Sequence, residues 1–237
     1  MRIDILTLFP EMLTSTLETS IVKRAQDSGH VEIHVHDIRD WADNKHRKVD
    51  DRPFGGGPGM VMMCQPLHDG VQEVERQLNT PPVRIHFTPQ GEVLKQERVE
   101  QLANEQNLLL IAGHYEGIDE RVIEKLNPLE LSTGDYVLSG GELPALLLVD
   151  AVVRLLPGVL GHDESADQDS FSKRGTEGNR LLDCPHYTRP RVWMEEEVPE
   201  VLLSGDHAAV EKWRKEQMVK RTEARRPDLL DNEEVDP

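Results

Sequence analysis

Three glycine-rich segments hold the residues in this chain that are best suited to chemistry: Asp50–Met60, Gly113–Gly117 and Ser132–Gly141. Because glycine has no Cβ, such loops allow backbone N–H and C=O groups to approach a ligand closely, at an entropic cost. Each segment also carries acidic or aromatic side chains. We therefore interpret them as ligand-binding loops rather than as tight turns alone.

Spacing argues against two common ligands of glycine loops. A phosphate-binding P-loop ends in Gly-Lys-Ser/Thr, and the chain contains no Gly-Lys dipeptide. A dinucleotide fold places Gly-x-Gly-x-x-Gly directly after its first strand. The expected first strand, residues 2–8, runs instead into Phe9-Pro10-Glu11.

Hydrophobic periodicity indicates the elements that position these loops. We expect strands at residues 2–8, 31–38, 83–87 and 107–111, and helical faces formed by Leu13, Leu17 and Ile21 and by Ile118, Val122 and Leu126. The alternation predicts an α/β fold with a mostly parallel sheet. Residues 107–111 form a nearly continuous apolar strand that leads into Gly113, as expected when ligand loops follow the carboxyl ends of parallel strands.

A chain of 237 residues has room for one large domain or two unequal domains. Residues 162–180 contain only Ala166 and Phe171 as apolar side chains, so we expect a linker there. This predicts a large domain over residues 1–161 and a small, mainly helical domain over residues 181–237. The latter includes a helix capped near Asp206, with Ala209, Val210 and Trp213 on its apolar face.

The formal net charge of −17 argues against a nucleic-acid partner, but the basic residues are clustered. Residues 206–226 hold seven basic and four acidic side chains, and residues 39–52 form a second base-rich loop that includes His46 and Arg52. RNA binding is therefore a hypothesis that charge alone does not establish.

Other features favour a cytoplasmic protein. Cys64 and Cys184 are far apart in sequence and form no disulfide-rich pattern, and the N-terminus lacks a signal-peptide pattern. The apolar run from Leu143 to Leu156 is interrupted by charges, so no membrane span is expected.

His34 and His36 alternate with apolar residues and are expected on the exposed face of a strand, so no metal site is predicted. The Cys184-Pro185-His186-Tyr187 run is interpreted as structural.

Several segments together resemble one family closely. They are DDRPFGGGPGMVM from Asp50, AGHYEGIDERV from Ala112, GDYVLSGGELPALLLVDAVVRLLPGVLG from Gly134, DSF from Asp169 and LLDCPHYTRP from Leu181. Over residues 1 to about 230, the chain resembles the TrmD family, the bacterial tRNA (guanine-N1)-methyltransferases of the SPOUT class.

This resemblance implies an enzyme that uses S-adenosyl-L-methionine to methylate N1 of the guanosine immediately 3′ of the tRNA anticodon. It implies a homodimer with active sites shared between the subunits, and a deep trefoil knot in the parallel-sheet catalytic domain. Residues 1–161 would bind the cofactor and residues 181–237 the tRNA. Magnesium is a further candidate cofactor, for which the sequence shows no site.

The resemblance also assigns residues to the site. The cofactor would lie against three loops and one residue of the second domain: Phe87, Thr88, Pro89, Gly113, Tyr115, Glu116, Gly117, Ser132, Thr133, Gly134, Tyr136, Leu138, Gly140, Gly141 and Asp183. We expect side chains at positions 140 and 141 to project into the adenine slot. Thr133 stands where many relatives have isoleucine. Candidate tRNA contacts are His46, Arg52, Gly59, Lys212, Arg214 and Lys215.

For catalysis, the resemblance assigns Asp169 as the general base that removes the N1 proton and Arg154 as the cation that stabilises charge on the guanine. The segment between Phe171 and Leu181 is longer than the usual family linker, and Arg180 stands where glycine is common. Two other classes remain open. A nucleotide-dependent oxidoreductase would also use glycine loops, and a non-catalytic RNA-binding module would explain the basic helix.

Overall fold

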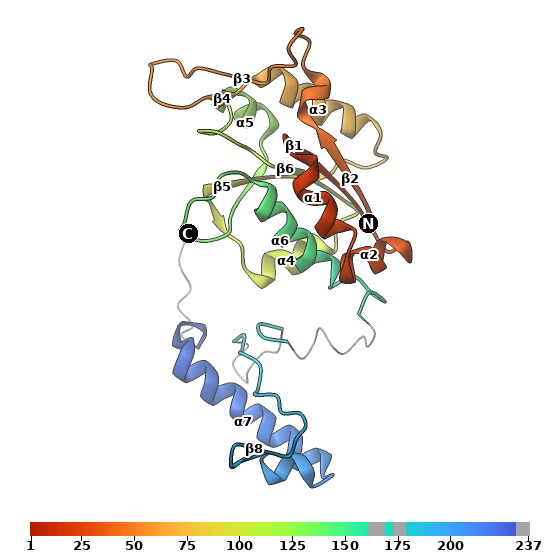
Figure 1. Ribbon diagram of the computed structural model, residues 1–237, viewed down its shortest axis with the longest axis vertical. Helices are drawn as coiled ribbons and strands as arrows, with labels where there is room; N and C mark the ends of the chain where they lie inside the picture. The colour runs from red at the N-terminus through yellow and green to blue at the C-terminus, as the bar shows by residue number, and fades with distance from the viewer. Residues whose placement is uncertain (161–168, 173–178, 231–237) are drawn as a thin grey trace. The chain divides into compact units, whose positions relative to one another are not determined.

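The computed structural model describes residues 1–160, 169–172 and 179–230 (Figure 1). The chain divides into a first unit, Met1–Gly161, and a second unit, His162–Pro237. Each is described by itself. Most of the linker predicted at residues 162–180 lies outside the described residues. Among the helices of the described part, none is long and apolar enough to cross a membrane.

A five-stranded sheet forms the centre of the first unit, and all its neighbouring strands are parallel. Its order is β2-β1-β6-β5-β7, and the strands are β1 (Arg2–Thr7), β2 (Glu32–Asp37), β5 (Val83–Val93), β6 (Asn107–Ile111) and β7 (Leu129–Ser132). The prediction of an α/β fold with a parallel sheet is confirmed.

Helices cover both faces of this sheet. They are α1 (Pro10–Leu17), α2 (Ser20–Asp27), α3 (Cys64–Arg76), α4 (Gln96–Ala103), α5 (Glu120–Leu126), α6 (Glu142–Val153) and the short 3-10 helix η1 (Ile38–Trp41). Successive side chains of β6 enter opposite cores: Leu108 and Leu110 pack with α1, α2, α4 and α6, whereas Leu109 and Ile111 pack with α3 and α5. Burial on both faces explains why this strand is apolar from Leu108 to Ile111.

Two helical patterns expected from the sequence are wrong at their ends. Leu13 and Leu17 are buried on α1, but Ile21 belongs to α2, because the chain turns between the helices and Ser20 has a φ of 55°. Ile118 precedes α5, which begins after the Asp119 cap, and it pairs with Met62 in an isolated parallel bridge. A repeat of four residues therefore does not by itself define one continuous helix.

The expected exposed face of β2 also needs a correction. His34 is exposed, but the Nε2 atom of His36 lies 2.8 Å from Oδ1 of the wholly buried Asp4. Arg2 donates to the same carboxylate at 2.8 and 2.9 Å. Burial raises the pKa of Asp4, but the hydrogen bonds from His36 and Arg2 outweigh that effect and leave it below its ordinary value. This cluster stabilises the sheet edge.

The second unit is built around one long helix. Helix α7 (His207–Arg225) begins at Asp206, whose carboxylate accepts from the backbone N–H groups of Ala208 and Ala209, as predicted for its cap. The remaining elements are β8 (Val192–Trp193), β9 (Glu196–Glu197), η3 (Glu200–Leu203) and η4 (Pro227–Leu229). Its buried hydrophobic residues are Leu181, Cys184 and Met218, a core much smaller than that of the first unit.

Candidate functional site

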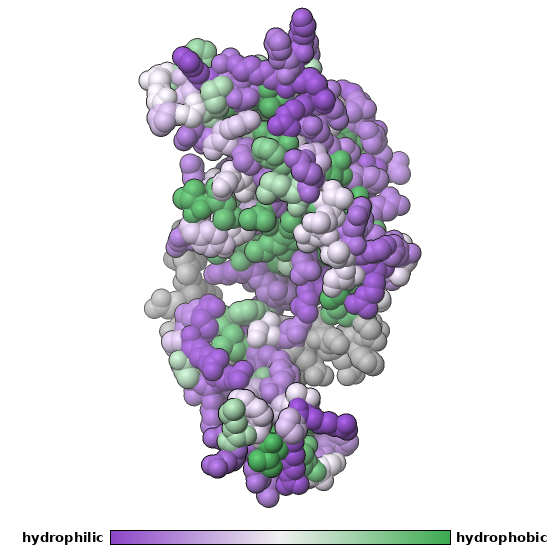
Figure 2. All heavy atoms as spheres, in the orientation of Figure 1, coloured by the Kyte–Doolittle hydropathy of each residue, from purple (hydrophilic) through white to green (hydrophobic). Residues whose placement is uncertain are grey.

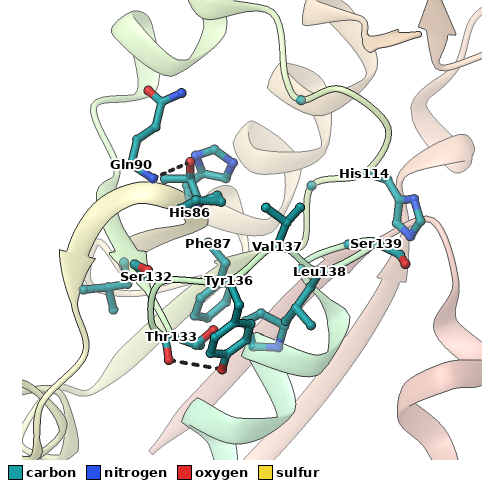
Figure 3. Close-up of a pocket in the computed structure, with 18 of the residues that line it drawn as sticks. His86, Phe87, Gln90, His114, Ser132, Thr133, Tyr136, Val137, Leu138 and Ser139 are labelled. Atoms are coloured by element: carbon teal, nitrogen blue, oxygen red, sulfur yellow. Dashed lines mark hydrogen bonds between the residues drawn. The ribbon is translucent and has the colours of Figure 1, made fainter. Parts of the chain in front are cut away.

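The carboxyl ends of β5, β6 and β7 meet at one edge of the sheet and open into a pocket of about 330 Å³ (Figure 3). These three strands are neighbours and run parallel, so the loops that follow them are brought together although they are far apart in sequence. Such an edge is the usual ligand site of a parallel sheet.

The first wall is a bulge in β5. Phe87 and Glu92 both pair with Leu131 of β7, so residues 88–91 lie outside the ladder and line the pocket, except for Gly91. A Cβ at Gly91 would lie 2.5 Å from the backbone carbon of Glu130, so only glycine fits there. The strand therefore continues to Val93, beyond the predicted end at Phe87.

The second wall is the segment Gly113–Gly117 after β6. Tyr115 has a φ of 63°, a left-handed conformation that is uncommon for a residue other than glycine. The segment is joined to the third wall because Gly141 donates its N–H to the Gly113 carbonyl at 2.8 Å, and His114 forms a bridge with Gly140. These backbone links hold the two loops in register.

The third wall is the segment Ser132–Gly141 after β7. Ser132 is buried, and its hydroxyl accepts from the Gly134 N–H at 3.1 Å, while Tyr136 donates its hydroxyl to the Thr133 carbonyl at 3.1 Å (Figure 3). The side chains of Tyr136, Val137 and Leu138 are exposed. The pocket thus combines apolar surface with fixed backbone polar groups, the usual composition of a small-molecule site.

The expectation that side chains at positions 140 and 141 would project into the adenine slot is wrong, because they would clash with the protein itself. A Cβ at Gly141 would not enter open pocket space but would lie 2.7 Å from the Cα of Ala112. A Cβ at Gly140 would meet the side chains of His114 and Glu142 at 2.4 Å. Both glycines are therefore required because the loop packs directly on the end of β6.

A buried polar group lies beneath this loop. Glu142, the first residue of α6, is 1% exposed, and its Oε1 atom accepts a hydrogen bond from the buried Thr7 hydroxyl at 2.7 Å. Its Oε2 atom has no hydrogen-bond partner within the described part of the chain and lies 3.5 Å from Nε2 of His114. A carboxylate at the amino end of a helix is favoured by the helix dipole.

His86 forms a second buried polar contact in the pocket wall. Its Nδ1 atom lies 3.2 Å from Oε1 of Glu130 on the neighbouring strand β7. Burial lowers the pKa of His86, and the opposing influence of Glu130 does not overcome that effect. His86 is therefore biased towards its neutral form.

Fourteen residues assigned to the cofactor by resemblance line this one pocket. They are Phe87, Thr88, Pro89, Gly113, Tyr115, Glu116, Gly117, Ser132, Thr133, Gly134, Tyr136, Leu138, Gly140 and Gly141. The sequence motifs did not assign the further lining residues His86, Gln90, His114, Leu131, Val137, Ser139 and Pro144. His114, Val137 and Ser139 lie inside the glycine-rich segments already identified, and Gln90 directly follows Pro89, so these four could have been found from the motifs.

The residues assigned to catalysis belong to different units. Arg154 ends α6 in the first unit. Asp169 lies in a turn of the second unit, where its carbonyl accepts from the Ser172 hydroxyl at 2.5 Å. Ser170 joins this turn to Asp183, whose N–H donates to the Ser170 hydroxyl at 3.0 Å. Two of the assigned residues, Asp169 and Asp183, are thus close neighbours in one unit.

Asp183 also belongs to a cluster within the segment that was interpreted as structural. Potential metal-ligand atoms of Asp183, Cys184 and His186 lie within 4.8 Å of one another. The Nε2 atom of His186 is 2.7 Å from Oδ2 of Asp183, so these two side chains already pair. Burial, with the nearby Asp183 carboxylate, raises the pKa of the Cys184 thiol above its ordinary value.

The candidate tRNA contacts are exposed in both units. His46, Arg52 and Gly59 lie on the surface of the first unit, and Lys212, Arg214 and Lys215 lie on the surface of α7 in the second. Gly59 has a φ of 78° and is so close to Glu116 that a Cβ there would clash with its side chain. The loop that contains Gly59 is thereby packed against the second wall of the pocket.

The amino-acid sequence is similar to one known protein family and to individual members of it. Residues 1–232 match the family described as tRNA (Guanine-1)-methyltransferase TrmD. A tRNA (guanine-N(1)-)-methyltransferase of Moorella thermoacetica is 53% identical, over 100% of this chain and 93% of that protein. Proteins with the same description from Pseudomonas fluorescens and Clostridioides difficile are 52% and 48% identical, over 98% and 97% of this chain and 90% and 97% of their own lengths.

Proposed function

The chain belongs to the TrmD family of tRNA (guanine-1)-methyltransferases, and on that premise we propose that it transfers a methyl group from S-adenosyl-L-methionine to N1 of the guanosine immediately 3′ of the tRNA anticodon. The observation that carries this proposal is the pocket at the ends of β5, β6 and β7. It gathers the glycine loops of the family motifs into one concave site.

The residues of the pocket fit this cofactor. A cavity of about 330 Å³ lies within the size range of small-molecule sites. The exposed side chains of Tyr136, Val137 and Leu138 offer apolar surface to a flat base, and the backbone groups of Gly113–Gly117 and Ser132–Gly141 offer donors and acceptors for its polar edge. When bound, the cofactor supplies an electrophilic methyl group on a sulfonium.

The chain's own residues must make the guanine reactive. N1 carries a proton in neutral guanine and is a poor nucleophile until that proton is removed. We assign the proton to the Asp169 carboxylate as N1 bonds to the methyl carbon and the carbon–sulfur bond breaks. Negative charge that develops on O6 would be stabilised by the Arg154 guanidinium. The leaving sulfur departs as a neutral thioether, so no further acid is needed.

A homodimer would allow the two units to act together. Helix α1 packs against α6, and the apolar side chains of Met12 on α1 and of Leu143 and Leu147 on α6 are exposed. Figure 2 shows hydrophobic surface over the region of α6. Water-exposed apolar surface of this kind is typical of subunit contacts. The proposal includes a site that uses the pocket of one subunit and Asp169 of the other, together with the trefoil knot that the family implies.

The second unit is proposed as a tRNA-binding unit. Exposed Lys212, Arg214 and Lys215 lie on one turn of α7 and can neutralise phosphates. Removing one such phosphate interaction reduces the slope of log affinity against log salt concentration by about 0.7–0.9. Because the substrate is tRNA, we propose a cytoplasmic location. Magnesium remains a candidate cofactor whose ligands are not assigned.

The direct test is methylation of an unmodified tRNA by the purified protein. With S-adenosyl-L-methionine, mass spectrometry of nuclease digests should detect 1-methylguanosine at the position 3′ of the anticodon. A matched transcript with adenosine at that position should remain unmethylated. Methylation at another nucleotide would overturn the positional assignment. Binding of nicotinamide nucleotides without any response to S-adenosyl-L-methionine would favour an oxidoreductase instead.

A further inference from the structure

Phe54 is the most exposed large hydrophobic side chain among the described residues, at 99%. It lies in the loop between two short antiparallel strands, β3 (Asp50–Asp51) and β4 (Val61–Met62), which projects from the first unit in Figure 1. No hydrophobic cluster described for the unit includes it. An aromatic ring so fully in water is unfavourable unless a partner covers it.

The three glycines that follow Phe54 lie in open space. Gly55, Gly56 and Gly57 have φ values of 86°, 79° and 115°, and a Cβ added at any of them would meet nothing within 4 Å. Their conformation therefore does not result from close packing. Three consecutive glycines in open space give the chain beside Phe54 unusual rotational freedom.

The base of the same loop is fixed to the pocket. The N–H of Glu116 donates to the Met60 carbonyl at 3.0 Å, and the N–H of Met62 donates to the Gly117 carbonyl at 2.9 Å. Both Glu116 and Gly117 line the pocket. Phe54 is five residues from Gly59, so its Cα lies at most about 18 Å from the glycine that packs on Glu116.

Residues 39–52, which lead into the loop, hold five Lys or Arg side chains and four Asp side chains, a net charge of +1 with His neutral. Lys45, His46, Arg47 and Arg52 are exposed in the segment that leads into the loop. Arg47 and Lys48 are paired with Asp40 and Asp51, and these surface pairs are readily exchanged for phosphate contacts. Basic side chains that can contact phosphates, next to an exposed aromatic ring that can stack on a base, are the combination found in proteins that bind single-stranded nucleic acid.

We propose that Phe54 stacks on an unstacked base of the tRNA anticodon loop, next to the guanosine that is methylated. This inference rests on the proposed function. N1 lies on the Watson–Crick edge, so the target guanine must turn out of its stack to reach a pocket, which leaves a neighbouring base with an uncovered face. Phe54 covers that face and holds the loop open, which makes it a positioning residue.

The proposal is tested with four proteins: wild type, Phe54→Ala, Phe54→Leu and Phe54→Trp. Loss of one stacked base weakens binding by roughly 5- to 150-fold. Phe54→Ala and Phe54→Leu should therefore raise the Kd for unmodified tRNA by that factor, because leucine is apolar but has no flat π face. Phe54→Trp should retain the wild-type Kd. The Kd for S-adenosyl-L-methionine should be the same in all four.

A spectroscopic readout separates stacking from a structural effect. Single 2-aminopurine substitutions at each anticodon-loop position flanking the target guanosine report whether that base is stacked. Wild type and Phe54→Trp should quench one of these probes on binding at saturating protein, whereas Phe54→Ala and Phe54→Leu should not. Circular dichroism melting should give equal stability for all four proteins, because the Phe54 side chain is almost wholly exposed.

Failure of the stacking role can be told apart from failure of the proposed methyltransferase function. If wild type methylates tRNA but all four proteins share one tRNA Kd and one fluorescence response, the stacking role is overturned and the methyltransferase assignment stands. If Phe54→Leu binds as tightly as wild type, a simple apolar contact replaces stacking and the proposal also fails. If wild type does not methylate tRNA, the proposed function itself is overturned.

Discussion

The two glycine-rich loops on either side of the Gly113–Gly117 segment use glycine for opposite physical reasons. Gly55, Gly56 and Gly57 adopt positive φ in open space, so they supply conformational freedom. Gly140 and Gly141 instead allow the loop backbone to pack closely on neighbouring residues, because a Cβ at either position would lie less than 3.0 Å from other protein atoms. The same residue type therefore marks an open, projecting loop in one case and a packed pocket wall in the other.

This difference predicts which loop tolerates a side chain. Gly141→Ala should weaken S-adenosyl-L-methionine binding by about 5- to 150-fold, because overpacking against the Ala112 backbone costs about 1–3 kcal/mol and separates two pocket walls. Gly56→Ala should leave the cofactor Kd unchanged and cost about 1 kcal/mol of stability, since alanine disfavours its φ of 79°. Calorimetric titration of both variants measures the effect. Equal cofactor affinities would contradict the distinction.

The packed loop should also depend on the buried contact below it. Thr7→Val removes the hydroxyl that donates to Glu142 and should lower the free energy of unfolding by about 1–3 kcal/mol. Thr14→Val on α1 is the matched control, because its hydroxyl donates to the Pro10 carbonyl at an exposed site, and its effect should stay within about 0.5 kcal/mol. Urea denaturation measures both. A Thr7→Val protein as stable as the control would show that Glu142 needs no donor.

The smallest expected effect concerns the pocket wall at His86. Because its pKa is lowered in the folded protein, the unfolded chain binds its proton more readily, near pH 6.5. The stability that His86 contributes is therefore fully present above about pH 6.5 and is lost as the pH falls from there through the folded pKa. His86→Gln should show a flatter dependence of Tm on pH across that interval. Parallel curves for the two proteins would contradict the assignment.

Much of the scaffold was predictable from residue patterns. The apolar run at residues 107–111 identified a doubly buried strand, and the Asp206 cap identified the start of α7. The break between α1 and α2 was missed because Ser20 gives no signal for its positive φ. The bulge at residues 88–91 was missed because it depends on the register with β7, which is a tertiary property.

The loops that line the pocket were predictable from the sequence, but the contacts that hold them together were not. Glycine spacing indicated the loops, and family resemblance assigned their roles. The contact of Glu142 with Thr7 and His114 joins three distant parts of the chain, so local pattern could not reveal it. Nor could the sequence alone separate the open glycines from the packed ones, since both occur as Gly-Gly pairs.

The proposed methyl transfer depends on one proton acceptor, and single-turnover kinetics test it most directly. Asp169→Asn keeps the size of the side chain but removes the basic oxygen. With saturating tRNA and S-adenosyl-L-methionine, its rate of 1-methylguanosine formation should fall by roughly 10²–10⁴, while both ligands still bind. A near-wild-type rate for Asp169→Asn would contradict the assignment of Asp169 as the base.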